Sequence, residues 1–88
     1  MKTMPQKLFD MVQQGASEEE VQIIFDALMH AEEQEKVYVN AYQGDETTFL
    51  FTNDGKQADQ QLTIFREKVR RPAIGFVSVD GDWQERKA

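Results

Sequence analysis

The spacing of hydrophobic residues predicts two helices in the first part of the chain. A short helix is expected over 5–14, because Leu8, Met11 and Val12 share one helical face. A longer helix is expected from Ser17 to about Glu33. Ser17 and Glu20 match a capping box, and apolar residues then recur at i, i+3, i+4, i+7 and i+8. Ala27 and Ala31 widen its apolar face, which indicates packing on two sides. The partners expected are the sheet on one side and the first helix or another chain on the other.

Two strands forming a hairpin are predicted next. Residues 36–42 alternate, with one face made of Val37, Val39 and Ala41 and the other of Tyr38, Asn40 and Tyr42. Residues 47–52 are rich in β-branched and aromatic side chains, which favour a second strand. The pattern does not register the two strands. If Phe49 and Phe51 share the tyrosine face, four aromatic rings line an open surface; otherwise the two phenylalanines are core.

The C-terminal part contains one ambiguous segment. Residues 58–70 fit either a helix or a strand, and we favour a helix because basic residues fill its last turn and Pro72 follows. On that helix Ala58, Leu62, Phe65 and Val69 share a face. Residues 73–79 are almost wholly apolar and predict a buried strand. A turn at 80–82 and a polar C-terminal tail at 83–88 complete the chain.

The predicted fold class is therefore α+β, in one domain that covers 1–88. The expected element order is α-α-β-β-α-β, with a three-stranded, mostly antiparallel sheet packed against the helices on one face. The order of the strands in the sheet stays open.

Composition narrows the classes of protein. The chain has 88 residues, 40% of them hydrophobic and 30% charged, which is typical of a globular domain. It has no apolar run of the ~20 residues that span a bilayer and no recognisable signal peptide. It has no cysteine and one histidine. We therefore expect a soluble, cytoplasmic protein with no membrane contact, no metal centre and no cofactor.

Charge is distributed unevenly along the chain. The formal net charge is −6, and residues 1–35 hold eight acidic side chains against Lys2 and Lys7. Residues 66–71 reverse the sign, with one glutamate and the basic cluster Arg66, Lys68, Arg70 and Arg71. Because an acidic protein is repelled by phosphate at long range, nucleic acid is an unfavoured partner, although a local basic face remains.

The candidate binding residues come from three features. The basic cluster has the chemistry to clamp carboxylate or phosphate groups, or else to compensate a helix dipole. Trp83 suits an exposed binding anchor or, alternatively, the edge of a small core. Tyr38 and Tyr42 suit a stacking surface only if their face of the sheet is open.

Other polar groups have simpler explanations. His30 lies near two acids on a solvated helix face, and Asp80 and Asp82 flank a glycine in an ordinary turn. Neither pattern matches a metal loop or a catalytic arrangement. The acids of the second helix have the chemistry to imitate DNA phosphates, but capping and solubility explain most of them.

The function predicted from these observations is a small acidic, non-enzymatic interaction module. It is expected to act as a regulator, inhibitor or adaptor by binding another protein, and a second copy of the chain is a further candidate partner. One alternative is binding of nucleic acid or anions through the basic cluster and an aromatic sheet face. A second is inhibition of a DNA-binding protein by DNA mimicry. The partner and pathway are not encoded in any motif.

Overall fold

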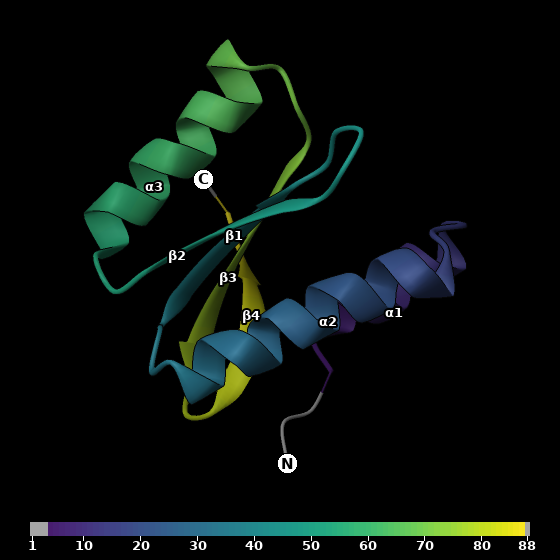
Figure 1. Ribbon diagram of the computed structural model, residues 1–88, viewed down its shortest axis with the longest axis horizontal. Helices are drawn as coiled ribbons and strands as arrows, with labels where there is room; N and C mark the ends of the chain where they lie inside the picture. Colours follow the sequence, from purple (N-terminus) through teal and green to yellow (C-terminus); the bar gives the residue numbers. More distant parts are fainter. Residues whose placement is uncertain (1–3, 88) are drawn as a thin grey trace.

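A computed structural model describes residues 4–87, in which three α-helices accompany four strands (Figure 1). In chain order the elements are α1 (Gln6–Gln13), α2 (Glu18–Glu33), β1 (Tyr38–Tyr42), β2 (Thr48–Thr52), α3 (Gly55–Thr63), a π-helical turn (Ile64–Lys68), β3 (Ala73–Val79) and β4 (Asp82–Arg86). The α+β class and the helical state of the ambiguous segment are thus confirmed. None of the helices in this part of the chain is long and apolar enough to cross a membrane.

The sheet has four strands in the order β2-β1-β3-β4, and every pairing is antiparallel. The prediction of three strands was therefore wrong, because most of β4 lies in the predicted polar tail. Asp80 and Gly81 have φ of 50° and 88°, so both adopt the left-handed conformation of a two-residue hairpin turn. This turn folds the chain back and pairs Trp83 with Ser78.

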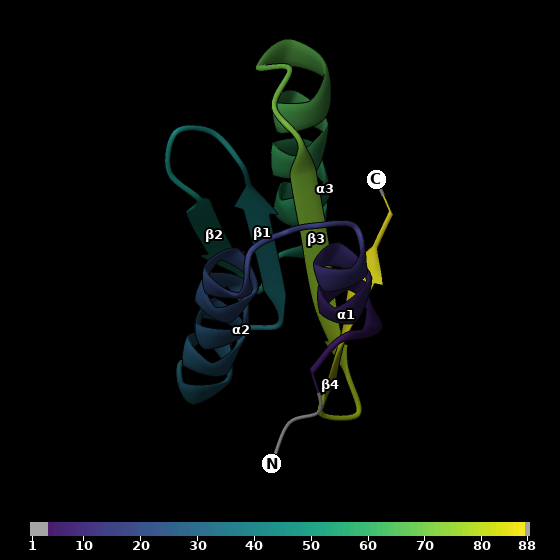
Figure 2. The same cartoon turned by 90° about the vertical axis from the view of Figure 1, so that its right-hand side faces the viewer.

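Helices cover both faces of the sheet, which corrects the prediction that all helices pack on one face. Figure 2 shows α1 and α2 on one side of the sheet and α3 on the other. The reason lies in β1, a central strand whose neighbouring residues Val39 and Asn40 point to opposite faces and are each only 1% exposed. Both faces of β1 therefore need a covering layer.

The face under α1 and α2 is a dry hydrophobic core. Its largest fully buried side chains include Phe76, Leu8, Ile24 and Leu28. The register pairs Val39 with both Phe51 and Phe76, so Phe49 and Phe51 share this face and not the tyrosine face. The open platform of four aromatic rings is thereby ruled out.

The two N-terminal helices end in the same way. The amide of Ala16 donates to Met11 O, and the amide of Lys36 donates to Ala31 O, each at 2.8 Å. Both bonds require a left-handed residue just before the donor. Gly15 supplies it after α1 with φ of 96°, whereas after α2 the position is held by Glu35 with φ of 55°. The predicted start of α2 is confirmed, because Ser17 Oγ accepts from the amide of Glu20 at 3.1 Å.

The third helix begins at a side-chain cap and ends in a wider turn. Asp54 accepts hydrogen bonds from the amides of Lys56 and Gln57 at 3.0 and 3.2 Å. At the other end the amide of Val69 donates to Ile64 O, five residues back, at 2.9 Å. This π-type bond adds a residue to the turn. Val69 consequently leaves the buried face of Ala58 and Leu62 and is 45% exposed, contrary to the simple helical pattern.

Candidate functional site

An open groove of about 660 Å³ lies where α1, the start of α2 and the segment before β3 meet. Its walls bring together residues that are far apart in the sequence. Its charged lining residues are Lys7, Glu20, Arg66, Arg70, Arg71 and Glu85. Three members of the predicted basic cluster therefore face one groove. We call it the basic groove.

Hydrogen bonds to a backbone carbonyl hold the Arg66 side chain in place at this groove. Its Nε and one terminal nitrogen donate to Ala73 O at 3.1 and 2.8 Å. The two bonds tie the π-helical turn to the start of β3 and orient the guanidinium plane. Since guanidinium carries five N–H donors, others remain for a ligand.

The next two arginines are placed by the end of the π-helical turn. Arg70 has φ of 56°, and the amide of Arg71 then donates to Phe65 O at 2.9 Å. The Arg71 guanidinium lies 5.8 Å from the centre of the Tyr42 ring, which is within cation–π range. Tyr42 in turn stacks on Phe65 with ring centres 4.0 Å apart. The backbone reversal therefore directs both side chains to one end of the sheet.

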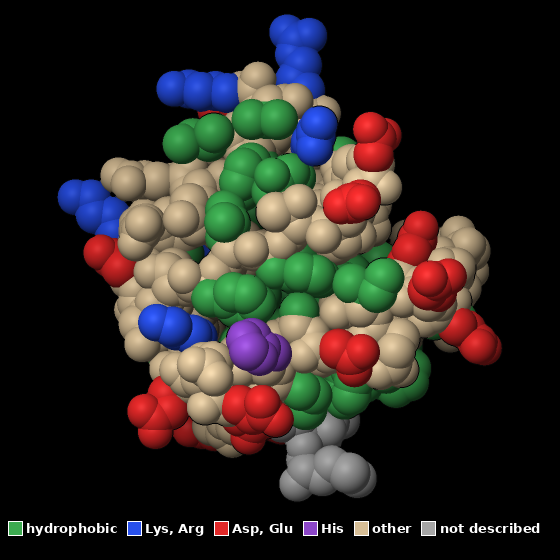
Figure 3. All heavy atoms as spheres, viewed as in Figure 1, with side chains coloured by type: hydrophobic (Ala, Val, Ile, Leu, Met, Phe, Trp, Pro, Cys, Tyr) green, Lys and Arg blue, Asp and Glu red, His purple; other side chains and the backbone are tan. Residues whose placement is uncertain are grey.

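The basic groove carries the opposite sign to the whole chain. Four cations and two anions line it, which leaves a local formal charge of +2 in a protein of −6. One of its anions, Glu85, lies 3.9 Å from Lys7. In Figure 3, Lys and Arg side chains project at the top near the end of α3 and also lie along the left side, whereas Asp and Glu are most frequent on the α1–α2 side and at the bottom of the view.

Lys68, the remaining member of the basic cluster, lies elsewhere. It lines a separate shallow surface with Lys56, Asp59 and Ile64, and it is exposed. The predicted cluster is thus split: Arg66, Arg70 and Arg71 line the basic groove, and Lys68 does not.

The aromatic candidates lie outside any open surface. Trp83 is 2% exposed and belongs to the core under α1 and α2. Tyr38 and Tyr42 are half-buried on the face that α3 covers. Tyr42 adjoins the basic groove through Arg71, and Tyr38 contacts Arg86, whose guanidinium carbon is 5.4 Å from the ring centre. The core placement of Trp83 matches the alternative explanation given above.

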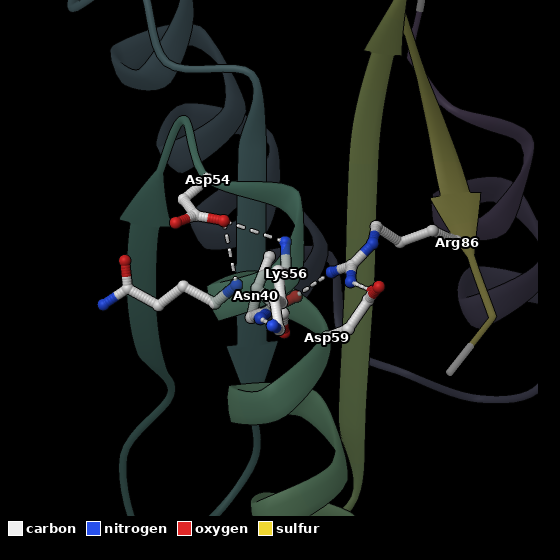
Figure 4. Close-up of polar contacts among 7 residues, drawn as sticks. Asn40, Asp54, Lys56, Asp59 and Arg86 are labelled. Carbon is white, nitrogen blue, oxygen red and sulfur yellow. Dashed lines mark hydrogen bonds and ion pairs between the residues drawn. The ribbon is translucent and has the colours of Figure 1, made fainter.

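A polar network that the sequence did not predict lies under α3. Asn40 donates to Ala58 O at 2.8 Å and accepts from Arg86 at 2.7 Å. Arg86 also forms an ion pair with Asp59 of α3. Figure 4 shows Arg86 reaching from β4 across β3 toward Asn40 and Asp59.

A glycine makes this reach possible. Gly75 of β3 is the register partner of both Asn40 and Arg86. A Cβ at position 75 would lie 2.9 Å from Arg86 Cγ and 3.0 Å from Asn40 Oδ1, closer than side chains pack. Because Gly75 has no side chain, the space above β3 stays free, and the Arg86 side chain crosses the strand there.

The polar network joins α3 to the sheet. Burial lowers the pKa of Arg86, and the neighbouring Tyr38 hydroxyl partly offsets this effect. Because its partners are an amide and a carboxylate of this chain, the network satisfies buried polar groups and fixes the position of α3.

The acidic pairs considered above stay apart from the basic groove. Asp80 and Asp82 are exposed at the hairpin between β3 and β4. Over residues 4–87, no group of three or more His, Cys, Asp or Glu side chains is arranged to hold a metal ion. His30 packs edge-on against Phe51, with ring centres 5.8 Å apart.

Comparisons with known proteins give no further guidance. No protein-family model matches the chain, and neither the search of curated proteins nor the search of solved structures found a match.

Proposed function

We propose that this chain is a small, non-enzymatic interaction module that regulates, inhibits or bridges another protein by binding an acidic segment of it. The observation that carries this proposal is the convergence of Lys7, Arg66, Arg70 and Arg71 on one groove. Guanidinium groups bind carboxylates in a two-pronged geometry, and here one of them is already oriented by backbone bonds.

The charge pattern of the whole molecule supports a selective role for the basic groove. A net charge of −6 repels acidic partners at long range, so only a segment that reaches the groove gains contacts. This arrangement favours recognition of a short acidic segment over coating of a large anionic surface. It also predicts binding that weakens as salt is added.

The nucleic-acid alternative relies on the same cations but has less support. Stacking of bases needs exposed aromatic rings, whereas Tyr42 stacks on Phe65 and Tyr38 lies under α3. DNA mimicry would rely on the acids of α2. Three of these, Glu18, Glu19 and Glu20, occupy the first turn, where they stabilise the helix dipole.

The test is affinity capture from a lysate of the source organism, with and without nuclease, using three immobilised proteins: wild type, Arg70→Glu and Lys68→Glu. Both substitutions make the same charge change within the same cluster, but only Arg70 lines the basic groove. We expect wild type and Lys68→Glu to retain the same protein partner. Arg70→Glu should retain about fivefold to tenfold less, a loss of roughly 1 kcal/mol.

Two results would count against this function. Equal retention by Arg70→Glu and wild type would remove the groove as the binding surface. A catch that disappears with nuclease would favour the nucleic-acid alternative.

A further inference from the structure

The free edge of β2 is a second surface with no role in the basic groove. Strands β2 and β4 form the two edges of the sheet (Figure 2). Edge strands expose unpaired backbone groups, and proteins usually protect them with charged side chains, prolines or bulges. The β4 strand carries Asp82, Glu85 and Arg86, whereas β2 has no charged residue and no proline. Its edge is therefore open to pairing.

The hydrogen bonds of β1 establish which residues of β2 face that edge. In an antiparallel strand, successive residues direct their N–H and C=O groups alternately to the two neighbouring strands. The amide of Ser78 donates to Val37 O at 3.2 Å, and the amide of Gln43 donates to Pro72 O at 3.0 Å. The odd-numbered residues that flank β1 therefore bond toward β3 through the Val37 carbonyl and the Gln43 amide, while the Val37 amide donates to the Asn53 side chain. The even-numbered residues of β1 bond toward β2.

The register carries this alternation into β2. The even residues of β1 are paired with Thr48, Leu50 and Thr52, which use their backbone groups inside the sheet. The backbone groups of Phe49 and Phe51 consequently point outward, to the free edge. Their side chains lie on the α2 face, where Phe51 is 36% exposed. Figure 3 shows hydrophobic side chains running across this side of the molecule, between β2 and α2.

The sequence of β2 is a palindrome. Residues 48–52 read Thr-Phe-Leu-Phe-Thr in both directions. A two-fold axis through Leu50 would therefore pair Phe49 with Phe51 of a second copy, and Thr48 with Thr52 of a second copy. Each phenylalanine then faces a phenylalanine, each threonine faces a threonine, and the two outward-facing residues exchange backbone hydrogen bonds. A second copy of β2 therefore matches this edge in both chemistry and register.

We propose that two copies of this chain form a symmetric dimer by antiparallel pairing of their β2 strands about Leu50. The two four-stranded sheets then make one continuous sheet, with both exposed Phe51 side chains covered. No residue that lines the basic groove lies on β2, so the dimer would present two grooves and the proposal is independent of what they bind.

The first test is the mass of the protein in solution, measured by sedimentation. We expect wild type at about twice the chain mass of 10.2 kDa. Leu50→Lys should shift to the mass of one chain, because the dimer axis would bring two like charges directly opposite each other. The control is Gln84→Lys, the same new charge on the exposed β4 edge, which should leave the dimer intact. Wild type at the mass of one chain throughout its soluble range would overturn the proposal.

A cysteine test checks the register and does not depend on how well Leu50→Lys folds. The chain has no cysteine, so one substitution introduces one thiol. Leu50→Cys should cross-link under mild oxidation, because non-hydrogen-bonded antiparallel pairs have Cα atoms about 4.5 Å apart. Thr48→Cys should not, because the two substituted positions would be four residues out of register, or about 13 Å apart. Cross-linking of Thr48→Cys but not of Leu50→Cys would overturn this register.

Discussion

The two faces of the sheet are covered in different ways. Under α1 and α2 the layer is apolar, with Phe76, Leu8 and Val39 each at most 1% exposed. Under α3 two apolar residues, Ala58 and Leu62, are fully buried, and they lie beside a polar network of Asn40, Arg86 and Asp59. A hydrophobic layer tolerates many arrangements of similar volume, whereas hydrogen bonds specify one position. We therefore expect the first face to supply most of the stability and the second to fix where α3 lies.

The position of α3 matters for the basic groove. Arg66, Arg70 and Arg71 follow α3 directly, while Lys7 comes from α1 on the other face. The groove exists only where segments from the two sides meet at one end of the sheet. An error in docking α3 would move three of its four cations.

The largest effect is expected from Phe76→Ala, which breaks the apolar face. The ring is fully buried in the core, and its removal should lower the free energy of unfolding by about 3–5 kcal/mol. Urea denaturation followed by circular dichroism measures this loss. Because small domains have only about 5–15 kcal/mol in total, partial unfolding in buffer is an expected outcome. A loss below about 1 kcal/mol would show that this face is not the main source of stability.

Asn40→Ala should break the polar face and release α3. The substitution removes a donor from Ala58 O and an acceptor from Arg86, and unsatisfied buried groups cost about 1–3 kcal/mol each. We expect a loss of about 2–3 kcal/mol for the pair. Hydrogen exchange should accelerate more at the amides of α3 than at those of α2. Equal acceleration in the two helices would contradict the division of roles between the faces.

Gly75→Ala tests the path of Arg86 across the sheet. The new methyl group should displace Arg86 from Asn40 and cost about 1–2 kcal/mol. In an Arg86→Ala background the same change should cost much less, since the obstructed side chain is gone. A double-mutant cycle on urea midpoints measures this coupling, which we expect at about 1 kcal/mol. Additive costs would mean that Arg86 does not depend on the missing Cβ.

The smallest effect is expected from Glu35→Gly, which touches neither face. Glycine relieves the left-handed strain at the end of α2 and should raise the free energy of unfolding by about 0.5–1 kcal/mol. Gly15→Ala is the matched change after α1 and should lower it by a similar amount. Thermal melts of the two variants should therefore shift in opposite directions.

Local signals predicted much of this fold. The capping box and apolar spacing located α2, and alternation located β1. The strand that was not predicted, β4, also had a local signal, because Asp80-Gly81 is a typical hairpin dipeptide after a buried strand. The residues after it were interpreted as a tail because they are polar, but an edge strand beside one buried Trp83 needs few apolar residues.

The candidate site was less accessible to sequence reasoning. Three arginines of the groove were found because they lie within six consecutive residues, 66–71. Lys7 and Glu85 join them only through the packing of α1 and β4, which no spacing rule reports. Asn40 was visible in the sequence as a polar residue in the middle of a strand, whereas its partner Arg86 lies 46 residues away. Long-range pairs of this kind depend on strand order, which the pattern left open.

The most direct test of the proposed function is an NMR titration of the purified protein with a glutamate-rich peptide at low salt. We expect the side-chain Nε–H resonances of Arg66, Arg70 and Arg71 to shift together, and the shifts to shrink in Arg70→Glu but not in Lys68→Glu. Added salt should reverse them, because surface ion pairs are screened. Unchanged arginine resonances, or equal responses in the two variants, would contradict the assignment of the basic groove as the binding site.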